Sequence, residues 1–543
     1  MARVVAPVFG AVLCAVGIAA CELPSAREVF GRTEEGNFVG GVVAEEPRAV
    51  LIGRDILTRG GSVADAAVAT YFAMAVTWPG TAGLGGGGSC LIHDPEEKRQ
   101  EALVFVPLNY IEKMRTRGVA QARDLAMVPG NPRGMFALHA RYGRVRWEQL
   151  LKPAVELARN GHPVSRALAR QLEAAPARAL ADPNFMRIFA PRGAVLREGD
   201  PLVQVELATI LSLISGQDAG ILYNGDLAGR FANGAAGIGV DIDRADLAAF
   251  VPEYLPTIKI EFGSHDLHFA PPPSDGSVLA AQQFAFLSDG GRYRRAQLNT
   301  RQHLFAEAQL IAMAGLQDWV RNLTERTRAD DLVSAAALGA MQARYDENRH
   351  RAPEANLTRR SLDVDHGSVG LVVTDAAGAS VACSFSMNAP FGTGKMVPGT
   401  GILLGAPVGD PGALTTPSGV VMLTNSVNNI FFYAAASGGG IGGSGALAQV
   451  STYVLEDELS LEDAIELPRL YAAYGRDDVL LYESWMDSGV VTGLGARGHR
   501  TIEANAIGIV SAIHCPGGLP RDRVCSVVSD PRGAGLAMVR QSR

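Results

Sequence analysis

The stretch LDVDHGSVGLVVTDAAGASVACSFSMNAPFGTGKMVPGTGILL, residues 362–404, decides the fold of this chain. Two runs in which apolar and polar residues alternate, 370–374 and 380–386, flank the turn sequence DAAG at 375–378. Alternation on both sides of a turn that contains Gly predicts a β-hairpin.

A small hydroxyl residue, Ser368, follows Gly367 at the mouth of the first strand. A flexible Gly before a hydroxyl suits a chain that cuts its own backbone there. Cleavage would leave Ser368 as a new N-terminal residue, with a nucleophilic hydroxyl and an α-amino group able to act as its base. We therefore expect autocleavage between Gly367 and Ser368; an ordinary turn serine is the alternative.

The hairpin and the Gly-rich loop after it resemble the γ-glutamyltranspeptidase family, whose signature is TTHxSVVDxxG followed by xNxxFGxG and GILL. Aligned without gaps backwards from Asn388 and Gly378, Ser368 falls on the catalytic Thr of the family. Alignment on His366 would instead place Val364 there and leave no nucleophile. The ungapped register is preferred, because a slip of one residue in a hairpin turns every side chain to the other face.

The resemblance extends from about residue 40 to about residue 535. It includes GGSVADAA at 60–67, GLGGGG at 83–88, VPG at 128–130, PPPS at 271–274 and SDPR at 529–532. It implies an α/β protein: one intertwined four-layer α/β/β/α sandwich of the N-terminal-nucleophile hydrolase type. A helix-rich large-subunit region, 40–367, and a strand-rich small-subunit region, 368–543, would stay together as a heterodimer after cleavage.

Several roles follow from the resemblance. Ser386 takes the place of a hydroxyl that hydrogen-bonds the nucleophile and aids self-cleavage. Asn388 matches an Asn that binds the amino-acid end of the substrate. The backbone N–H groups of Gly439 and Gly440, in the SGGG stretch 437–440, would form an oxyanion hole. Loss of one such donor typically costs about 3 kcal/mol of transition-state stabilisation.

Three further residues belong to the expected substrate pocket. Asp410 stands where the family pairs an Asp with the substrate's α-ammonium, and Thr415 and Thr416 stand where it has two serines of a carboxylate-binding pocket. The expected substrate is a small-molecule amide or peptide, and no cofactor is implied.

Other positions depart from the family. The DxRE segment, whose Arg binds the α-carboxylate of a γ-glutamyl group, corresponds here to VFVP at 104–107, with Val106 in place of the Arg. A bidentate Arg–carboxylate pair is the strongest specificity element of such a pocket. An amide-rich segment becomes GAPVG at 405–409, and Val369 and Gly370 replace a Thr and a His. Glutathione is therefore a poor expected substrate. Lys395 could supply a compensating cation, but an ordinary solvated surface Lys is the favoured interpretation.

Two functional hypotheses compete. In the first, the chain is an autocleaved amidohydrolase or acyltransferase, in which Ser368 attacks an amide carbonyl and forms an acyl-enzyme. In the second, it is an unprocessed pseudoenzyme that serves as a binding or scaffold lipoprotein of the cell envelope. The retained hydroxyls favour the first, and the missing Arg favours the second.

The N-terminus predicts export. A basic start is followed by an apolar stretch at 4–20, and IAAC at 18–21 is typical of a lipobox. We expect a signal peptide over 1–20, lipidation at Cys21, a linker over 21–39 and a periplasmic protein held to a membrane by acyl chains. A signal peptide that merely contains a Cys is the alternative.

The remaining cysteines would lie in the periplasm, which is an oxidising compartment. Cys515 and Cys525 bracket a PGGLP loop and can close a disulfide under oxidising conditions, with two unrelated thiols as the alternative. Cys90 and Cys383 lie in predicted buried strands and are expected to act as small hydrophobic residues. No Cys/His spacing indicates a metal site.

Composition fits a large globular protein. Of 543 residues, 47% are hydrophobic and 19% charged, enough to bury a substantial core. A net charge of −7 without a basic stripe argues against nucleic-acid binding. Periodicity predicts helices over 49–59, 62–76, 147–160, 202–215 and 303–315, and further strands over 420–423 and 430–434.

Overall fold

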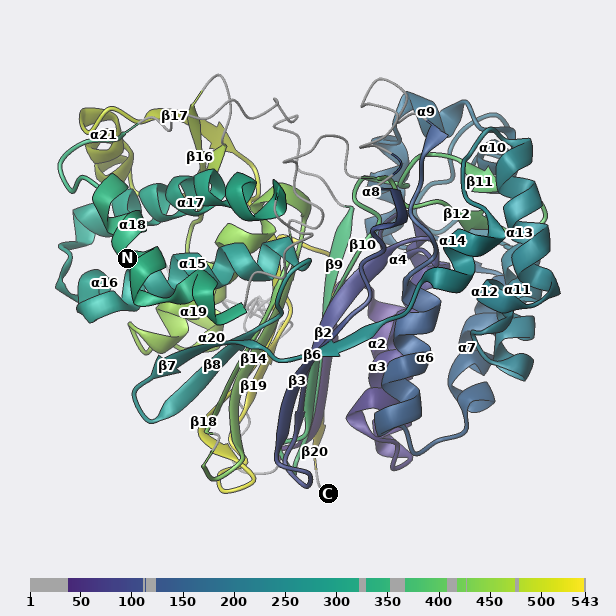
Figure 1. Ribbon diagram of the computed structural model, residues 1–543, viewed down its shortest axis with the longest axis horizontal. Helices are drawn as coiled ribbons and strands as arrows, with labels where there is room; N and C mark the ends of the chain where they lie inside the picture. Colours follow the sequence, from purple (N-terminus) through teal and green to yellow (C-terminus); the bar gives the residue numbers. More distant parts are fainter. Residues whose placement is uncertain are drawn as a thin grey trace, which may run out of the picture.

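Two antiparallel β-sheets face each other at the centre of the molecule (Figure 1). The computed structural model describes residues 38–110, 113, 124–321, 329–351, 367–407, 418–425, 427–473 and 478–541. The first sheet has the order β20 (Leu536–Gln541), β1 (Phe38–Ala44), β9 (Ser368–Asp375), β10 (Ser380–Ser386), β2 (Gly87–Asp94), β3 (Arg99–Val104) and β6 (Glu253–Leu255). The second has the order β19 (Ser526–Val528), β18 (Ile509–Leu519), β14 (Ile430–Gly438), β13 (Val420–Asn425), β8 (His265–Phe269) and β7 (Ile258–Phe262).

Helices cover the outer face of each sheet, which gives the expected α/β/β/α sandwich (Figure 1). The first sheet is covered by α2 (Pro47–Thr58), α3 (Val63–Thr77) and α6 (Asn131–Tyr142), with α7 (Trp147–Asn160) and α11 (Val205–Gln217) packed outside them. The second is covered by α15 (Asp275–Ser288), α19 (Gly443–Leu455) and α20 (Leu461–Glu466), with α17 (Leu298–Arg321) and α18 (Ala335–Arg344) packed outside α15. Among the described residues, no helix combines the length and the apolar character that crossing a membrane requires.

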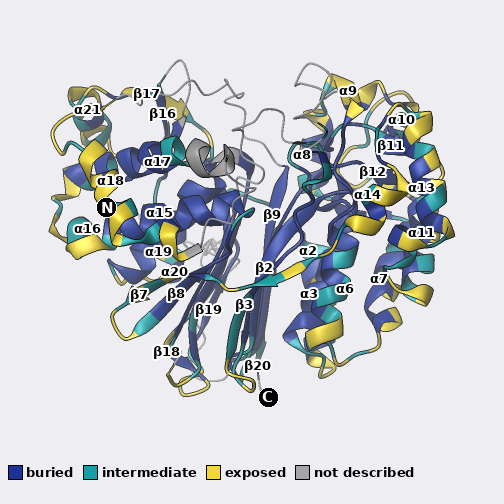
Figure 2. Cartoon of the chain, in the orientation of Figure 1, coloured by how far each residue is buried: buried dark blue, intermediate teal, exposed yellow. Residues whose placement is uncertain are grey.

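Alternation along β9 explains how one strand serves two cores. Leu371 and Val373 pack toward the helices, whereas Val372 packs between the sheets. Successive side chains of a strand point to opposite faces, so both faces of β9 are apolar and buried. Figure 2 shows both sheets and the inner sides of the helices buried, with exposed residues confined to the outside. The nucleophile strand is thus held inside the sandwich.

The predicted hairpin is confirmed. β9 and β10 pair without a register shift from Ser368 opposite Ser386 to Thr374 opposite Ser380. Between them, the Gly378 N–H donates to the Asp375 carbonyl at 3.1 Å, and Gly378 has a φ of +87°, a conformation that favours Gly. The pairing is continuous and has no β-bulge between Ser368 and Ser386.

Helix predictions hold with shifted ends. α3 begins directly after Ser62, whose side chain forms a capping box with Asp65. α7 has the predicted bounds, and α17 is longer than predicted at both ends. α11 begins three residues late, because Leu202 lies in β5 (Pro201–Leu202), which pairs with β4 (His162–Pro163).

The expectation of a helix-rich N-terminal region was incomplete. β1, β2, β3 and β6 from that region build most of the sheet that contains β9, and β7 and β8 join the other sheet. β2, where the sequence predicted a buried strand around Cys90, is buried along nearly all of its length. Both sheets therefore combine strands from both sides of the expected cleavage point.

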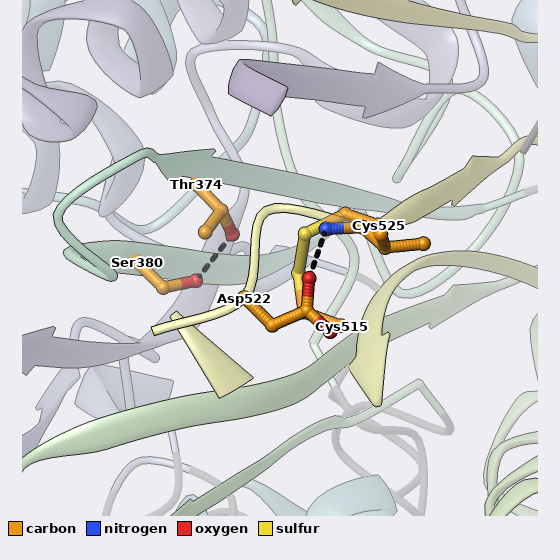
Figure 3. Close-up of a disulfide and its surroundings, with 6 residues drawn as sticks. Thr374, Ser380, Cys515, Asp522 and Cys525 are labelled. Atoms are coloured by element: carbon orange, nitrogen blue, oxygen red, sulfur yellow. Dashed lines mark hydrogen bonds between the residues drawn. A yellow bond between two sulfur atoms is a disulfide. The ribbon is translucent and has the colours of Figure 1, made fainter. Parts of the chain in front are cut away.

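Two disulfides cross-link the described chain. Cys515–Cys525 joins the interior of β18 to the segment before β19, and Figure 3 shows it near the Thr374–Ser380 hydroxyl pair of the hairpin. In the same loop Asp522 accepts the Val524 N–H at 3.1 Å.

The second disulfide corrects a prediction. Cys90 and Cys383 are buried as expected, but they are bonded to each other and not separate thiols. They lie directly opposite in the β2–β10 pairing, with Cα atoms 4.0 Å apart. The bond joins positions 293 residues apart, and only the strand order brings them together.

Candidate active site

Ser368 is the first residue of β9, between β1 and β10. Its side chain is buried, with a relative exposure of 1%. Its Oγ accepts the Gly440 N–H at 3.2 Å, and its carbonyl accepts the Gly439 N–H at 3.2 Å. The start of β9 is therefore fixed to the loop that follows β14 in the opposite sheet.

The carbonyl of Gly367, which belongs to the peptide bond before Ser368, has two donors. The Ser386 hydroxyl donates to it at 3.1 Å and the Met387 N–H at 2.9 Å. Both come from the end of β10, which the hairpin register places beside Gly367. Two donors on one carbonyl oxygen polarise it and would stabilise the negative charge that develops when a nucleophile attacks its carbon.

Asn388 orients this arrangement. Its N–H donates to Ser386 Oγ at 2.9 Å, and its side-chain amide donates to the Ala406 carbonyl at 3.0 Å. Its φ of +61° lies in the left-handed region, which Asn tolerates better than most residues. In the intact chain Asn388 thus links the end of β10 to the segment at 405–407, whereas the sequence predicted a substrate contact.

The Gly-rich loop after β14 approaches Ser368 closely. Gly439 and Gly440 both have positive φ, +75° and +74°. A Cβ on Gly438 would lie 2.3 Å from a carboxyl oxygen of Glu45 and 2.8 Å from the Ser368 carbonyl oxygen. α19 begins just beyond the loop, so the partial positive charge of its N-terminus lies on this side of the site. The structure brings Gly439 and Gly440 to Ser368, with only the Gly440 N–H on the hydroxyl.

Glu45 is part of the site and was missed from the sequence. It follows β1, is 1% exposed, and its Oε1 accepts the Gly370 N–H at 3.3 Å. Burial raises the pKa of this carboxyl to about 8, and the nearby Asp530 charge adds to the rise. Two acidic residues directly after a buried strand, Glu45 and Glu46, were the available signal.

Val106, the residue expected in place of the family's Arg, lies in apolar surroundings. Val106 is 7% exposed and belongs to the core between the sheets, together with Val104. Lys395, the possible compensating cation, donates from Nζ to the Ile238 carbonyl at 3.3 Å. In the GAPVG segment, which begins at Gly405, the Gly405 N–H donates to the Gly85 carbonyl at 3.1 Å.

Some predicted positions lie outside the described residues. These are Cys21, His366, Asp410, Thr415 and Thr416.

Known proteins are similar to this chain in sequence and in fold. Residues 49–539 match the model of the family described as Gamma-glutamyltranspeptidase. The chain is 30% identical over 377 residues to Glutathione hydrolase 3 of Arabidopsis thaliana, which covers 67% of this chain and 59% of the plant protein. It is 28% identical over 497 residues to the Acylase ACY 1 proenzyme of Pseudomonas sp. (strain SE83), covering 86% of this chain and 88% of that protein.

Among solved structures, a cephalosporin acylase from Bacillus halodurans superposes with a TM-score of 0.81 at 22% identity, over 97% of this chain and all of the acylase chain. This superposition shows that the chain has the N-terminal-nucleophile hydrolase fold. The family match over residues 49–539 shows that the chain belongs to the gamma-glutamyltranspeptidase family, as a divergent member and a γ-glutamyltransferase-like amidase or acyltransferase.

Proposed function

We propose that this chain is a proenzyme that cuts its own Gly367–Ser368 bond and then uses Ser368 to transfer the acyl group of an amide to water or an amine. The observation that carries the proposal is the pair of donors on the Gly367 carbonyl in the intact chain, from Ser386 at 3.1 Å and Met387 at 2.9 Å. The Ser386 hydroxyl is also 3.3 Å from Asn388 Oδ1, but the Gly367 carbonyl is its nearer acceptor.

The self-cleavage step follows from this geometry. Ser368 Oγ attacks the Gly367 carbonyl carbon, and the resulting oxyanion is stabilised by the Ser386 O–H and the Met387 N–H. The C–N bond then breaks, the hydroxyl proton passes to the departing nitrogen, and an ester joins Gly367 to Ser368 Oγ. Water hydrolyses the ester, which releases a Gly367 carboxylate and a Ser368 with a free hydroxyl and a free α-amino group.

In the processed enzyme the same hydroxyl becomes the nucleophile toward substrate. The freed α-amino group of Ser368 takes the hydroxyl proton as Oγ attacks the substrate amide. The Gly440 N–H, already 3.2 Å from Oγ, is well placed to stabilise the oxyanion. The amine leaves with the proton, and water or a second amine then releases the acyl group from Ser368.

We further propose an acyl donor whose acyl group lacks an α-carboxylate. A buried valine at 106, inside an apolar core, cannot pair with such a charge, and a carboxylate desolvated without a partner is strongly disfavoured. The similarity to an acylase proenzyme over most of both chains supports an amide as the acyl donor. Asn388, Asp410, Thr415 and Thr416 remain the proposed contacts to the rest of the substrate.

We also propose that the protein is exported, lipidated at Cys21 and held at the periplasmic side of a membrane. The sequence motif at 18–21 motivates this location. The two disulfides of the described chain support it, because disulfides persist mainly in oxidising compartments.

Intact-mass analysis of the purified mature protein tests the processing. We expect two fragments that meet at Gly367 and Ser368. A single chain without activity would contradict the proposal and favour the envelope binding or scaffold protein. A single chain with full activity would show that Ser368 does not need a free α-amino group.

Matched anilides test the acyl group. The γ-glutamyl, 4-aminobutyryl and butyryl p-nitroanilides differ only in the α-carboxylate and the amino group. We expect kcat/KM for one of the two compounds without the α-carboxylate to exceed that for the γ-glutamyl compound by at least about tenfold, which corresponds to about 1.4 kcal/mol. Efficient turnover of the γ-glutamyl compound alone would show that another cation replaces the missing Arg.

A further inference from the structure

A second buried polar cluster lies away from Ser368, on the outer side of the second sheet. Figure 1 shows α17, α18, α21 (Ser488–Ala496) and β17 (Arg500–Ala504) gathered there. His303 and Glu307 lie one turn apart on α17, and His499 directly precedes β17. The three side chains are almost fully buried, and their ligand atoms all lie within 4.8 Å of one another.

Hydrogen bonds define which atom of His303 is free to bind a cation. Its Nε2 lies 2.9 Å from the Asp346 carbonyl, which can only accept, so Nε2 carries the proton. Nδ1 therefore presents a lone pair, and it points to His499 Nε2 at 2.7 Å. A metal-ligating His usually donates its other N–H to a carbonyl or carboxylate in this way.

Glu307 is held by a comparable support. Its Oε1 accepts from His350 Nδ1 at 2.7 Å, and His350 Nε2 donates to Asp478 at 2.6 Å. The same Oε1 lies 3.7 Å from His499 Nε2. A carboxylate oxygen and two imidazole nitrogens therefore converge, and those of His303 and Glu307 are oriented by neighbouring groups.

We propose that His303 Nδ1, His499 Nε2 and a carboxylate oxygen of Glu307 bind a divalent transition metal of the zinc type. Two His and one Glu form a known zinc ligand set, and borderline metals favour imidazole with carboxylate. Zinc bonds of about 2.0–2.1 Å require ligand atoms roughly 3.3 Å apart, so His499 would move outward and Glu307 would rotate inward by small amounts. His499 would carry its proton on Nδ1, which leaves the charge of the ring unchanged.

Such a metal would have a structural role at the junction of the two subunit regions. His303 and Glu307 belong to the large-subunit region and His499 to the small-subunit region, on either side of Gly367–Ser368. If the chain is cut as proposed above, the metal would bind both fragments. No Cys/His spacing in the sequence indicated this set, because His499 is 196 residues from His303.

Zinc titration of the chelator-treated full-length protein tests the site. We expect one zinc ion per chain by elemental analysis, and Co²⁺ in its place should give the visible absorption of a tetrahedral site. Glu307→Gln and His499→Gln should each lower zinc occupancy at least tenfold at the same free zinc. His350→Gln should weaken binding by about 10–100-fold, the usual effect of losing a group that orients a ligand. His514→Gln, at a largely buried His of β18 outside the cluster, should leave zinc binding unchanged.

These zinc measurements can contradict the metal site whether or not the chain is cut. Failure of the wild-type protein to bind zinc, or equal occupancy in Glu307→Gln and His499→Gln, would show that the cluster is only hydrogen-bonded. If both variants misfold by circular dichroism, zinc X-ray absorption of the wild type decides, since two imidazoles in the first shell are required. The uncut Ser368→Ala variant should bind zinc as the wild type does, which separates this proposal from the proposed processing.

Discussion

The start of β9 and the surroundings of Val106 differ in chemistry. At the start of β9, polar donors from Ser386, Met387 and Gly440 converge on the Gly367 carbonyl and the Ser368 hydroxyl. Val106, in contrast, is buried in an apolar core. Under the proposed function, the groups that would break the bond are therefore polar, and the position proposed to face the acyl group is apolar. Because the two functions lie on different segments, specificity can change without loss of the nucleophile.

Removal of the nucleophile should have the largest effect. Ser368→Ala should leave the chain uncut and without amidase activity, because no other described group occupies the position of its hydroxyl. The removed hydroxyl is small and the chain should fold normally. Denaturing gels and intact mass measure the cleavage.

Ser368→Thr serves as the control for this variant. It restores a hydroxyl, so it should recover at least part of the cleavage. An alanine variant that still cuts at 367/368 would exclude Ser368 as the nucleophile of the first step.

Loss of the hydroxyl that donates to Gly367 should come next in size. Ser386→Ala removes one of two donors to the developing oxyanion, and such a loss typically slows a reaction by about 10²–10³-fold. The rate of conversion of freshly made precursor to fragments measures this effect.

Ser384→Ala is the matched control. Ser384 is a buried serine on the same strand, but its Oγ bonds to Ser418 Oγ at 2.6 Å and not to Gly367. Equal cleavage rates for the two variants would remove the special role of the Ser386 hydroxyl.

The buried carboxyl of Glu45, which lies beside β9, should make the free energy of unfolding depend on pH. The pKa of Glu45 is raised to about 8 in the folded chain, so the folded state binds more protons than the unfolded state between pH 4.5 and 8. The free energy of unfolding should therefore fall as pH rises through this range, by about 1.4 kcal/mol per pH unit from this group alone. Glu45→Gln mimics the protonated form and should be the more stable protein, with a difference that grows up to about pH 8.

Chemical unfolding of both proteins at several pH values measures this difference. Glu173→Gln, on the exposed end of α8 (Arg166–Glu173), is the control and should follow the wild type. A constant difference between Glu45→Gln and wild type across this range would mean that Glu45 is ionised throughout.

The apolar surroundings of Val106 should respond in stability and not in cleavage. Val106→Thr keeps the shape but buries a hydroxyl among hydrophobic side chains, which costs about 1–3 kcal/mol when no partner is available. Equilibrium unfolding should show this loss, whereas the rate of self-cleavage should not change. A large drop in the rate of self-cleavage would show that the surroundings of Val106 affect the groups around Ser368.

Local patterns in the sequence determined the hairpin and the helices nearby. Alternation on both sides of a Gly turn is enough to pair Ser368 with Ser386, because hairpin register depends on neighbouring residues. The same holds for α3, whose start is set by the Ser62 cap, and for α7. The resemblance also gave the four-layer sandwich and the proximity of Gly440 to Ser368.

Only the tertiary structure decided which distant residues meet. The strand order places Cys90 against Cys383. β1 brings Glu45 beside β9. The packing of α17 near the start of β17 brings His303 to His499. Each contact joins segments far apart in the chain, and no local periodicity records such a pairing. Burial of Glu45 also sets its pKa, since the desolvation that raises it depends on the layers packed around the carboxyl and not on its neighbours in sequence.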